Sequence, residues 1–159
     1  MTRYAANTDV PVDRSRAELE RTLDRYGATE FLYGRDTSSV MIMFGMRGRR
    51  VRFIIPMPDP KAPEFTTYLR GSTKYRRTDD AARKEWEQAC RQRWRALNLV
   101  VKAKLEAVET GIGSFEEEFL AYLVVPGQDV TVGQVAIPAL DAAGNGQGFA
   151  PLLPAIEGR

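Results

Sequence analysis

From Thr78 to Thr110 the chain contains neither glycine nor proline, the two residues that most readily end a helix. Thr78 can cap a first turn, and Asp79 and Asp80 follow it where the helix dipole favours anions. The pattern predicts one helix of about 32 residues, which at 1.5 Å per residue is roughly 48 Å long. A helix of that length dominates the architecture of a chain of 159 residues.

One face of this predicted helix is apolar and aromatic. A sheet can bury such a stripe, including both tryptophans, against one of its faces. Cys90 is the only cysteine of the chain, so no intrachain disulfide forms, and a buried thiol in a reducing cytoplasm is expected. The stripe consists of Trp86, Cys90, Arg93 or Trp94, Leu97, Val101, Leu105 and Val108.

Three predicted strands precede the helix and form an antiparallel meander. Glu30–Tyr33 is short, and Val40–Phe44 is apolar on both of its faces. Val51–Ile55 alternates apolar side chains with Arg52 and Ile54, which gives one buried and one largely basic face. The turn between the second and third strands falls at 46–49, and prolines from Pro56 onward end the third strand.

A helix before the meander and a fourth strand after it are also predicted. Ser15 and Glu18 fit a capping box, and we expect a helix from about Arg14 to Tyr26 that ends at Gly27. The β-branched and aromatic content of Phe65–Leu69 favours a fourth strand.

The C-terminal part is predicted to hold short helices. A second capping box from Ser114 to Glu117 begins one, while Thr131–Leu140 fits either a helix or a strand. The fold class is therefore α+β: an N-terminal helix, an antiparallel meander of three to four strands, a long helix packed on the sheet, and short C-terminal helices. We expect a single domain over residues 1–140 and a flexible tail rich in glycine and proline over 141–159.

Positive charge is concentrated in one part of the chain. The total net charge is +2, yet the window between Met46 and Thr78 holds nine basic and two acidic residues, a net charge of +7. Arginine side chains match phosphate oxygens and aromatic rings stack on unpaired bases, so this composition predicts a surface for single-stranded nucleic acid. The predicted contact residues are Arg47, Arg49, Arg50, Arg52, Tyr68, Arg70, Lys74, Tyr75, Arg76 and Arg77.

A purely structural explanation of part of this window stays open. Arginines at alternate positions of an exposed strand, such as Arg50 and Arg52, also keep that strand solvated. Cations along the long helix could extend the basic surface, although Glu85 and Glu87 beside them indicate that some are simply solvated or paired. These cations are Arg83, Lys84, Arg91, Arg93 and Arg95.

Few residues could support catalysis. The chain has no histidine, which removes Ser-His-Asp, Cys-His and histidine-containing zinc sites. It has no glycine-rich phosphate loop, so we predict no cofactor. The acidic run Glu116–Glu118 fits a helix N-terminus; alternatively, with Asp129 or Asp141 it could bind Mg²⁺. We therefore expect a protein that is not an enzyme, with a nuclease that uses Glu117, Glu118 and Asp129 as an alternative.

Several segments resemble a family of small phage and prophage proteins: Tyr4–Val10, Ser15–Glu20, Tyr26–Ala28, Glu87–Leu97 and Lys102–Glu109. The resemblance covers nearly the whole chain and weakens after Gly144. It implies a phage or mobile-element setting, where replication, recombination and anti-defence functions are common, and it assigns no role to any residue. A meander followed by a long helix also resembles, in architecture alone, the core of phage single-strand annealing proteins.

The sequence thus favours non-enzymatic binding of single-stranded nucleic acid, with strand annealing or accessory recombination as a finer hypothesis. The alternative is a protein-binding module, such as a phage inhibitor of a host enzyme or a subunit of an assembly. No apolar run approaches the ~20 residues that span a bilayer, so we expect a cytoplasmic protein without a membrane partner. Homo-oligomers are expected if the long helix has more apolar surface than one small sheet covers.

Overall fold

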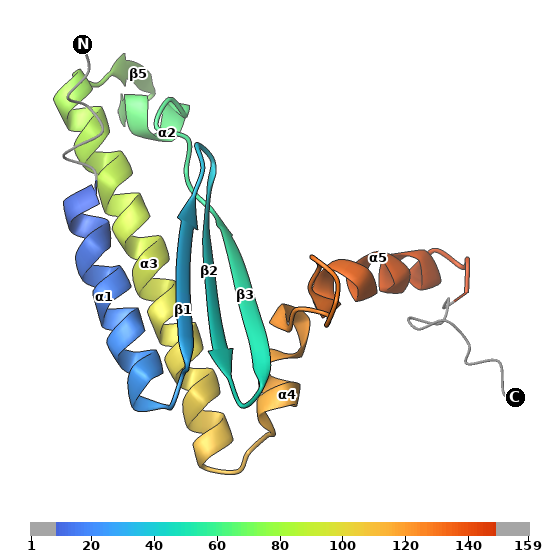
Figure 1. Cartoon of the computed structure of the whole chain (residues 1–159). Helices are drawn as coiled ribbons and strands as arrows, with labels where there is room; N and C mark the ends of the chain where they lie inside the picture. Colours follow the sequence, from blue (N-terminus) through green and yellow to red (C-terminus); the bar gives the residue numbers. More distant parts are fainter. Residues whose placement is uncertain (1–8, 149–159) are drawn as a thin grey trace, which may run out of the picture.

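The computed structural model describes residues 9–148 (Figure 1). Two helices lie side by side against a three-stranded sheet, a second hairpin lies at one end of the sheet, and the last helix projects from the body. This arrangement confirms the predicted α+β fold. The elements are α1 (Asp9–Arg25), β1 (Glu30–Arg35), β2 (Ser39–Met46), β3 (Arg49–Pro56), α2 (Pro63–Thr66), β4 (Thr67–Arg70), β5 (Thr73–Arg76), α3 (Asp79–Glu109), α4 (Phe115–Phe119), the 3₁₀ turn η1 (Leu120–Tyr122) and α5 (Val132–Gly144).

The main sheet is an antiparallel meander in the order β1-β2-β3, as predicted. At the β1–β2 turn, Asp36 Oδ1 accepts hydrogen bonds from the backbone N–H groups of Ser38 and Ser39, each at 2.6 Å. These hydrogen bonds stabilise the carboxylate and lower the pKa of Asp36 to about 2. At the β2–β3 turn, Arg47 and Gly48 both have positive φ, 53° and 75°, as a two-residue type I′ turn requires.

The core lies between the sheet and the α1–α3 pair. Trp94 on α3 is fully buried, and its ring lies 6.1 Å from that of Tyr33 on β1. Phe44 on β2 packs edge-on against Phe119 of α4 at 5.9 Å, which closes the other end of the core. Cys90 is buried as predicted, and burial raises the pKa of its thiol to about 11.

The first helix begins earlier than predicted. α1 already includes Asp9, so Ser15 lies inside the helix and the predicted capping box at Ser15 is wrong. Pro11 lies in the first turn of α1. Backbone N–H groups in the first turn make no hydrogen bond within a helix, so a proline at this position does not end it. The predicted end is confirmed, because Gly27 follows α1 with a φ of 89°.

The predicted fourth strand is not part of the meander. Pro63 begins a short helix that includes Phe65 and Thr66, since proline is well suited to the first helical turn. The chain then forms β4, which pairs only with β5 in a separate two-stranded sheet. The turn between them uses Gly71, whose φ is 64°.

The ambiguous segment near the C-terminus is a helix. Thr131 and Gln134 form a reciprocal capping box at the start of α5. α5 continues to Gly144, past the domain boundary predicted at Leu140, and residues 149–159 of the predicted tail lie outside the described residues. Among the helices within 9–148, none has both the length and the apolarity needed to cross a bilayer.

Candidate nucleic-acid interface

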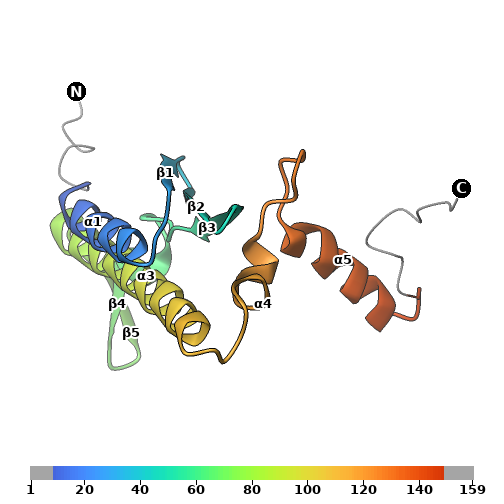
Figure 2. The ribbon, with the colours of Figure 1, turned by 60° about the horizontal axis from the view of Figure 1, so that its bottom comes forward.

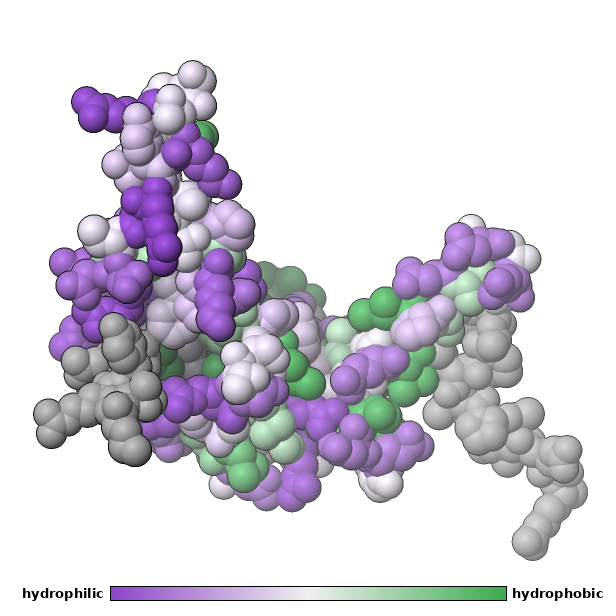
Figure 3. Space-filling model, turned by 90° about the horizontal axis from the view of Figure 1, so that it is seen from above, coloured by the Kyte–Doolittle hydropathy of each residue, from purple (hydrophilic) through white to green (hydrophobic). Residues whose placement is uncertain are grey.

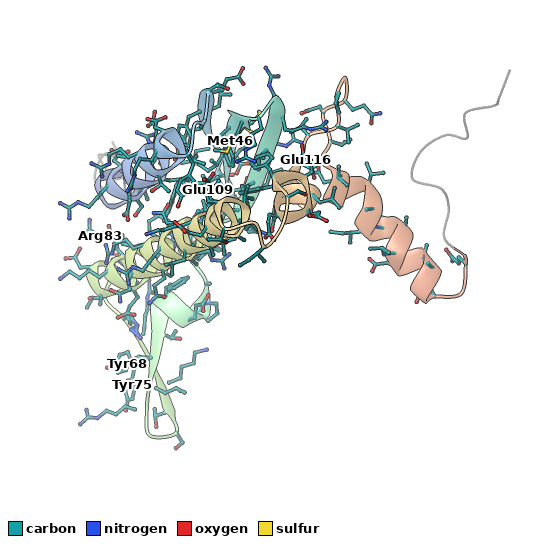
Figure 4. All side chains as sticks on the ribbon, turned by 90° about the horizontal axis from the view of Figure 1, so that it is seen from below. Met46, Tyr68, Tyr75, Arg83, Glu109 and Glu116 are labelled. Atoms are coloured by element: carbon teal, nitrogen blue, oxygen red, sulfur yellow. The ribbon has the colours of Figure 1, made fainter. Side chains whose placement is uncertain are left out.

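The predicted contact residues lie in two groups at opposite ends of α3. In the first group Arg47 contacts Glu109, the last residue of α3, whereas in the second Arg77 contacts Glu85 near its first turn. These two positions on α3 are about 36 Å apart at 1.5 Å per residue. Figure 4 shows that the two groups are apart: Met46, Glu109 and Glu116 lie together in the upper middle of the view, whereas Tyr68 and Tyr75 lie on the hairpin at the bottom. The basic window is therefore not one continuous surface.

The first group is neutralised by acidic partners. Arg47 pairs with Glu109 at 3.3 Å, Arg49 with Glu116 at 3.4 Å and Arg50 with Glu30 at 3.3 Å. Three cations thus meet three carboxylates, and all six side chains are exposed enough for solvent to screen the pairs. This end of the molecule carries little net positive charge for a polyanion.

Arg52 does not belong to an exposed basic face, so its predicted phosphate contact is wrong. Its side chain is only 7% exposed. The guanidinium donates hydrogen bonds to Asp129 Oδ1 at 2.5 Å, to the carbonyl of Asp129 at 3.1 Å and to Gln134 Oε1 at 3.2 Å. These bonds fasten the segment before α5 to β3, a structural task that leaves the guanidinium unavailable to a ligand.

We expect Asp129→Ala to lower the free energy of unfolding by about 1–2 kcal/mol, because a buried guanidinium loses a charged hydrogen-bond partner. Urea unfolding followed by circular dichroism measures the change. Asp141→Ala is the matched control, since Asp141 is an exposed acid on α5. Equal stability of the two variants would contradict the fastening role of Arg52.

The second group lies on the β4–β5 hairpin. We call residues 67–77 the basic hairpin; it projects from the body beside the first turns of α3 (Figure 2). No residue from 67 to 76 is buried. The strand register sets Tyr68 opposite Tyr75, and their rings stack at 5.6 Å with an interplanar angle of 25°. Each tyrosine is still more than two-fifths exposed, at 43% and 44%.

The basic hairpin carries four cations and no acidic residue. Arg70 and Lys74 make no ion pair with any described residue. Arg76 lies 4.0 Å from Asp79, with both side chains more than four-fifths exposed. Arg77 is held more firmly: it lies 3.9 Å from Glu85, and its guanidinium carbon lies 5.8 Å from the centre of the Tyr68 ring.

Strand alternation gives the basic hairpin two different faces. Tyr68, Tyr75 and Arg70 share one face, while Lys74 and Arg76 share the other with Leu69. Leu69 is 71% exposed and was not among the predicted contact residues. The exposure of Leu69 could not be predicted from its apolar side chain, because it arises from the pairing of β4 with β5 in a sheet separate from the meander.

The acidic run does not form a metal site. Glu117 accepts hydrogen bonds from the backbone N–H and hydroxyl of Ser114, both at 2.8 Å, which completes the predicted capping box. Asp129 instead pairs with Arg52. Within the part of the chain that the structure describes, no three Cys, Asp or Glu side chains converge as metal ligands would. The geometry therefore gives the nuclease alternative no support.

Comparison with protein-family models, curated proteins and solved structures found no match to this chain.

Proposed function

We propose that this protein binds single-stranded nucleic acid through the basic hairpin, in a role that is not catalytic. One observation carries the proposal: two exposed tyrosine rings lie among four cations on an element that buries none of its residues from 67 to 76. A two-stranded hairpin gains little stability by itself. The cross-strand pair of Tyr68 and Tyr75 stabilises the hairpin. Core burial, however, does not account for the exposed rings and cations, which suit a ligand with both flat rings and negative charge.

Unpaired bases supply the flat rings, and phosphates supply the charge. In a duplex the bases are stacked on each other, so the tyrosines would have no free base to stack on. The proposal therefore includes a preference for single strands over duplexes. From the resemblance to phage and prophage proteins, we extend it to strands handled during recombination or annealing.

Arg70→Gln combined with Lys74→Gln tests the cationic part of the proposal. The salt slope is the slope of the logarithm of the binding constant against the logarithm of the salt concentration. Each lost phosphate contact reduces its magnitude by about 0.7 for a single strand, so the double variant should reduce it by about 1.4. The affinity at about 0.1 M salt should fall on the order of 20-fold. Fluorescence anisotropy with a labelled single strand across a salt series measures both quantities.

The matched control is Arg49→Gln combined with Arg50→Gln. This variant removes the same charge from the other end of α3, where both arginines already pair with glutamates. It should bind nearly as well as the wild type. Equal losses in the two variants would show that general charge, and not the basic hairpin, determines affinity.

A protein-binding role remains a second candidate because of α5. This helix projects from the body, and Figure 3 shows apolar surface along it. Ile137 and Leu140 are 56% and 57% exposed. Sedimentation equilibrium tests this role. It would be favoured if the wild type is an oligomer and the double variant Ile137→Ser with Leu140→Ser is a monomer.

A further inference from the structure

A second basic surface lies between α1 and α3, away from the basic hairpin. The two helices run side by side in the same direction (Figures 1 and 2). They enclose a groove of about 570 Å³. One carboxylate, Glu18, lies among the lining residues, and five cations outnumber it: Arg14, Arg25, Arg91, Arg95 and Lys102.

Helical spacing explains why these cations line up. Arg91, Arg95 and Lys102 each follow directly after a buried residue of α3, so they form a stripe beside the one that packs on the sheet. Arg14 and Arg25 are eleven residues apart on α1, the same separation as Arg91 and Lys102 on α3. Each helix therefore carries cations over about 16 Å of the groove.

The charge of the groove is not compensated within the described part of the chain. None of its five cations makes an ion pair with a residue in 9–148. The arginines at the β2–β3 turn, in contrast, each have a glutamate partner. Uncompensated cations in a concave surface produce a focused positive potential that attracts polyanions.

The lining also indicates which part of a polyanion fits. Among residues 9–148, no aromatic side chain lines the groove, so this part of the chain offers no ring there on which a base could stack. The Asn98 side chain already donates a hydrogen bond to the carbonyl of Ser15 at 3.3 Å. The hydroxyls of Ser15 and Thr22 also line the groove, and its charged donors are all arginine or lysine side chains, which suit phosphate oxygens. Over about 16 Å, one strand of a duplex carries about five phosphates.

We propose that the α1–α3 groove binds the phosphodiester backbone of nucleic acid. The inference rests on the proposed function, since it takes the same class of ligand, but it assigns a different task to a different surface. The basic hairpin stacks bases and requires single strands, whereas the groove contacts only the backbone. The groove therefore contributes to the binding of single strands and duplexes alike.

Arg95→Gln combined with Lys102→Gln tests the inference in the full chain. Both side chains are exposed, and glutamine is a good helix former, so the fold should persist, as a circular-dichroism melt would verify. Anisotropy titrations use a labelled single strand and a labelled duplex. The magnitude of the salt slope should fall by about 1.4 for the single strand and about 1.8 for the duplex. The control variant Arg49→Gln with Arg50→Gln should leave it unchanged.

The outcomes separate the two proposals. If the wild type binds single strands and the groove variant matches the control, the groove inference is overturned and the proposed function stands. If the groove variant loses affinity and Arg70→Gln with Lys74→Gln does not, the groove is supported and the role of the hairpin is wrong. Labelled polyglutamate is titrated directly as a third probe. If the wild type binds polyglutamate and neither oligonucleotide, both proposals are overturned in favour of an acidic protein partner.

Discussion

Replacing Tyr68 and Tyr75 with alanine is expected to weaken binding to a single-stranded oligonucleotide by about 1–3 kcal/mol for each base that stacks on a ring. Duplex binding should not change, because paired bases cannot stack on the tyrosines. The salt slope should also keep its wild-type value, since the variant retains all four cations of the basic hairpin. Anisotropy titrations of one labelled strand, alone and annealed to its complement, measure all three quantities.

Tyr68→Phe with Tyr75→Phe is the matched control. It removes both hydroxyls and keeps both rings, so it should bind single strands nearly as tightly as the wild type. Both tyrosines are exposed and neither belongs to the core, so all three proteins should melt at similar temperatures. A phenylalanine variant as weak as the alanine variant would mean that the hydroxyls, and not stacked rings, make the contact.

Trp94→Ala is expected to lower the free energy of unfolding by about 3–5 kcal/mol. Trp94 is fully buried between α3 and the sheet, where it packs near Tyr33. Its removal leaves a large cavity in the core that joins α1, α3 and the meander. Urea unfolding followed by far-ultraviolet circular dichroism measures the loss.

Trp94→Phe should cost much less than Trp94→Ala. The indole N–H of Trp94 is buried and has no hydrogen-bond acceptor among the described residues, so wild type already carries a penalty of about 1–3 kcal/mol that phenylalanine removes. That relief offsets part of the lost volume. If Trp94→Phe and Trp94→Ala lower the free energy of unfolding by similar amounts, the account is contradicted. The indole N–H would then have an acceptor, and the ring volume would not be the main contribution of Trp94 to stability.

Local patterns in the sequence were enough to predict the main architecture. The long run without glycine or proline predicts α3, and its apolar spacing predicts the burial of Trp94 and Leu97. Alternation along β2 and β3 predicts the meander. In β2, the side chains of Val40, Ile42 and Phe44 are buried on one face, while those of Met41 and Met43 on the other face are half-buried. Each of these signals depends on residues close together in the chain.

Features set by distant residues could not be predicted in this way. Arg52 looks like part of an exposed basic face, but Asp129 and Gln134, more than seventy residues later, cover it. The basic window likewise looks continuous until α3 separates its two halves. The groove cations Arg14 and Arg91 come from helices that meet only in the fold.

The candidate site was partly predictable. The composition of the window indicates the tyrosines and cations of the basic hairpin, but not that β4 leaves the main sheet and exposes Leu69. Nor does it indicate the stacking of Tyr68 on Tyr75, which follows from the strand register around Gly71.

Ultraviolet crosslinking followed by peptide mapping tests the central claim most directly. The wild-type protein is irradiated with a labelled single-stranded oligonucleotide and then digested. Mass spectrometry identifies the residues that carry the labelled strand. We predict crosslinks at Tyr68 and Tyr75, which disappear in the presence of excess unlabelled single strand. Crosslinks confined to residues outside 67–77, or none at all, would contradict binding through the basic hairpin.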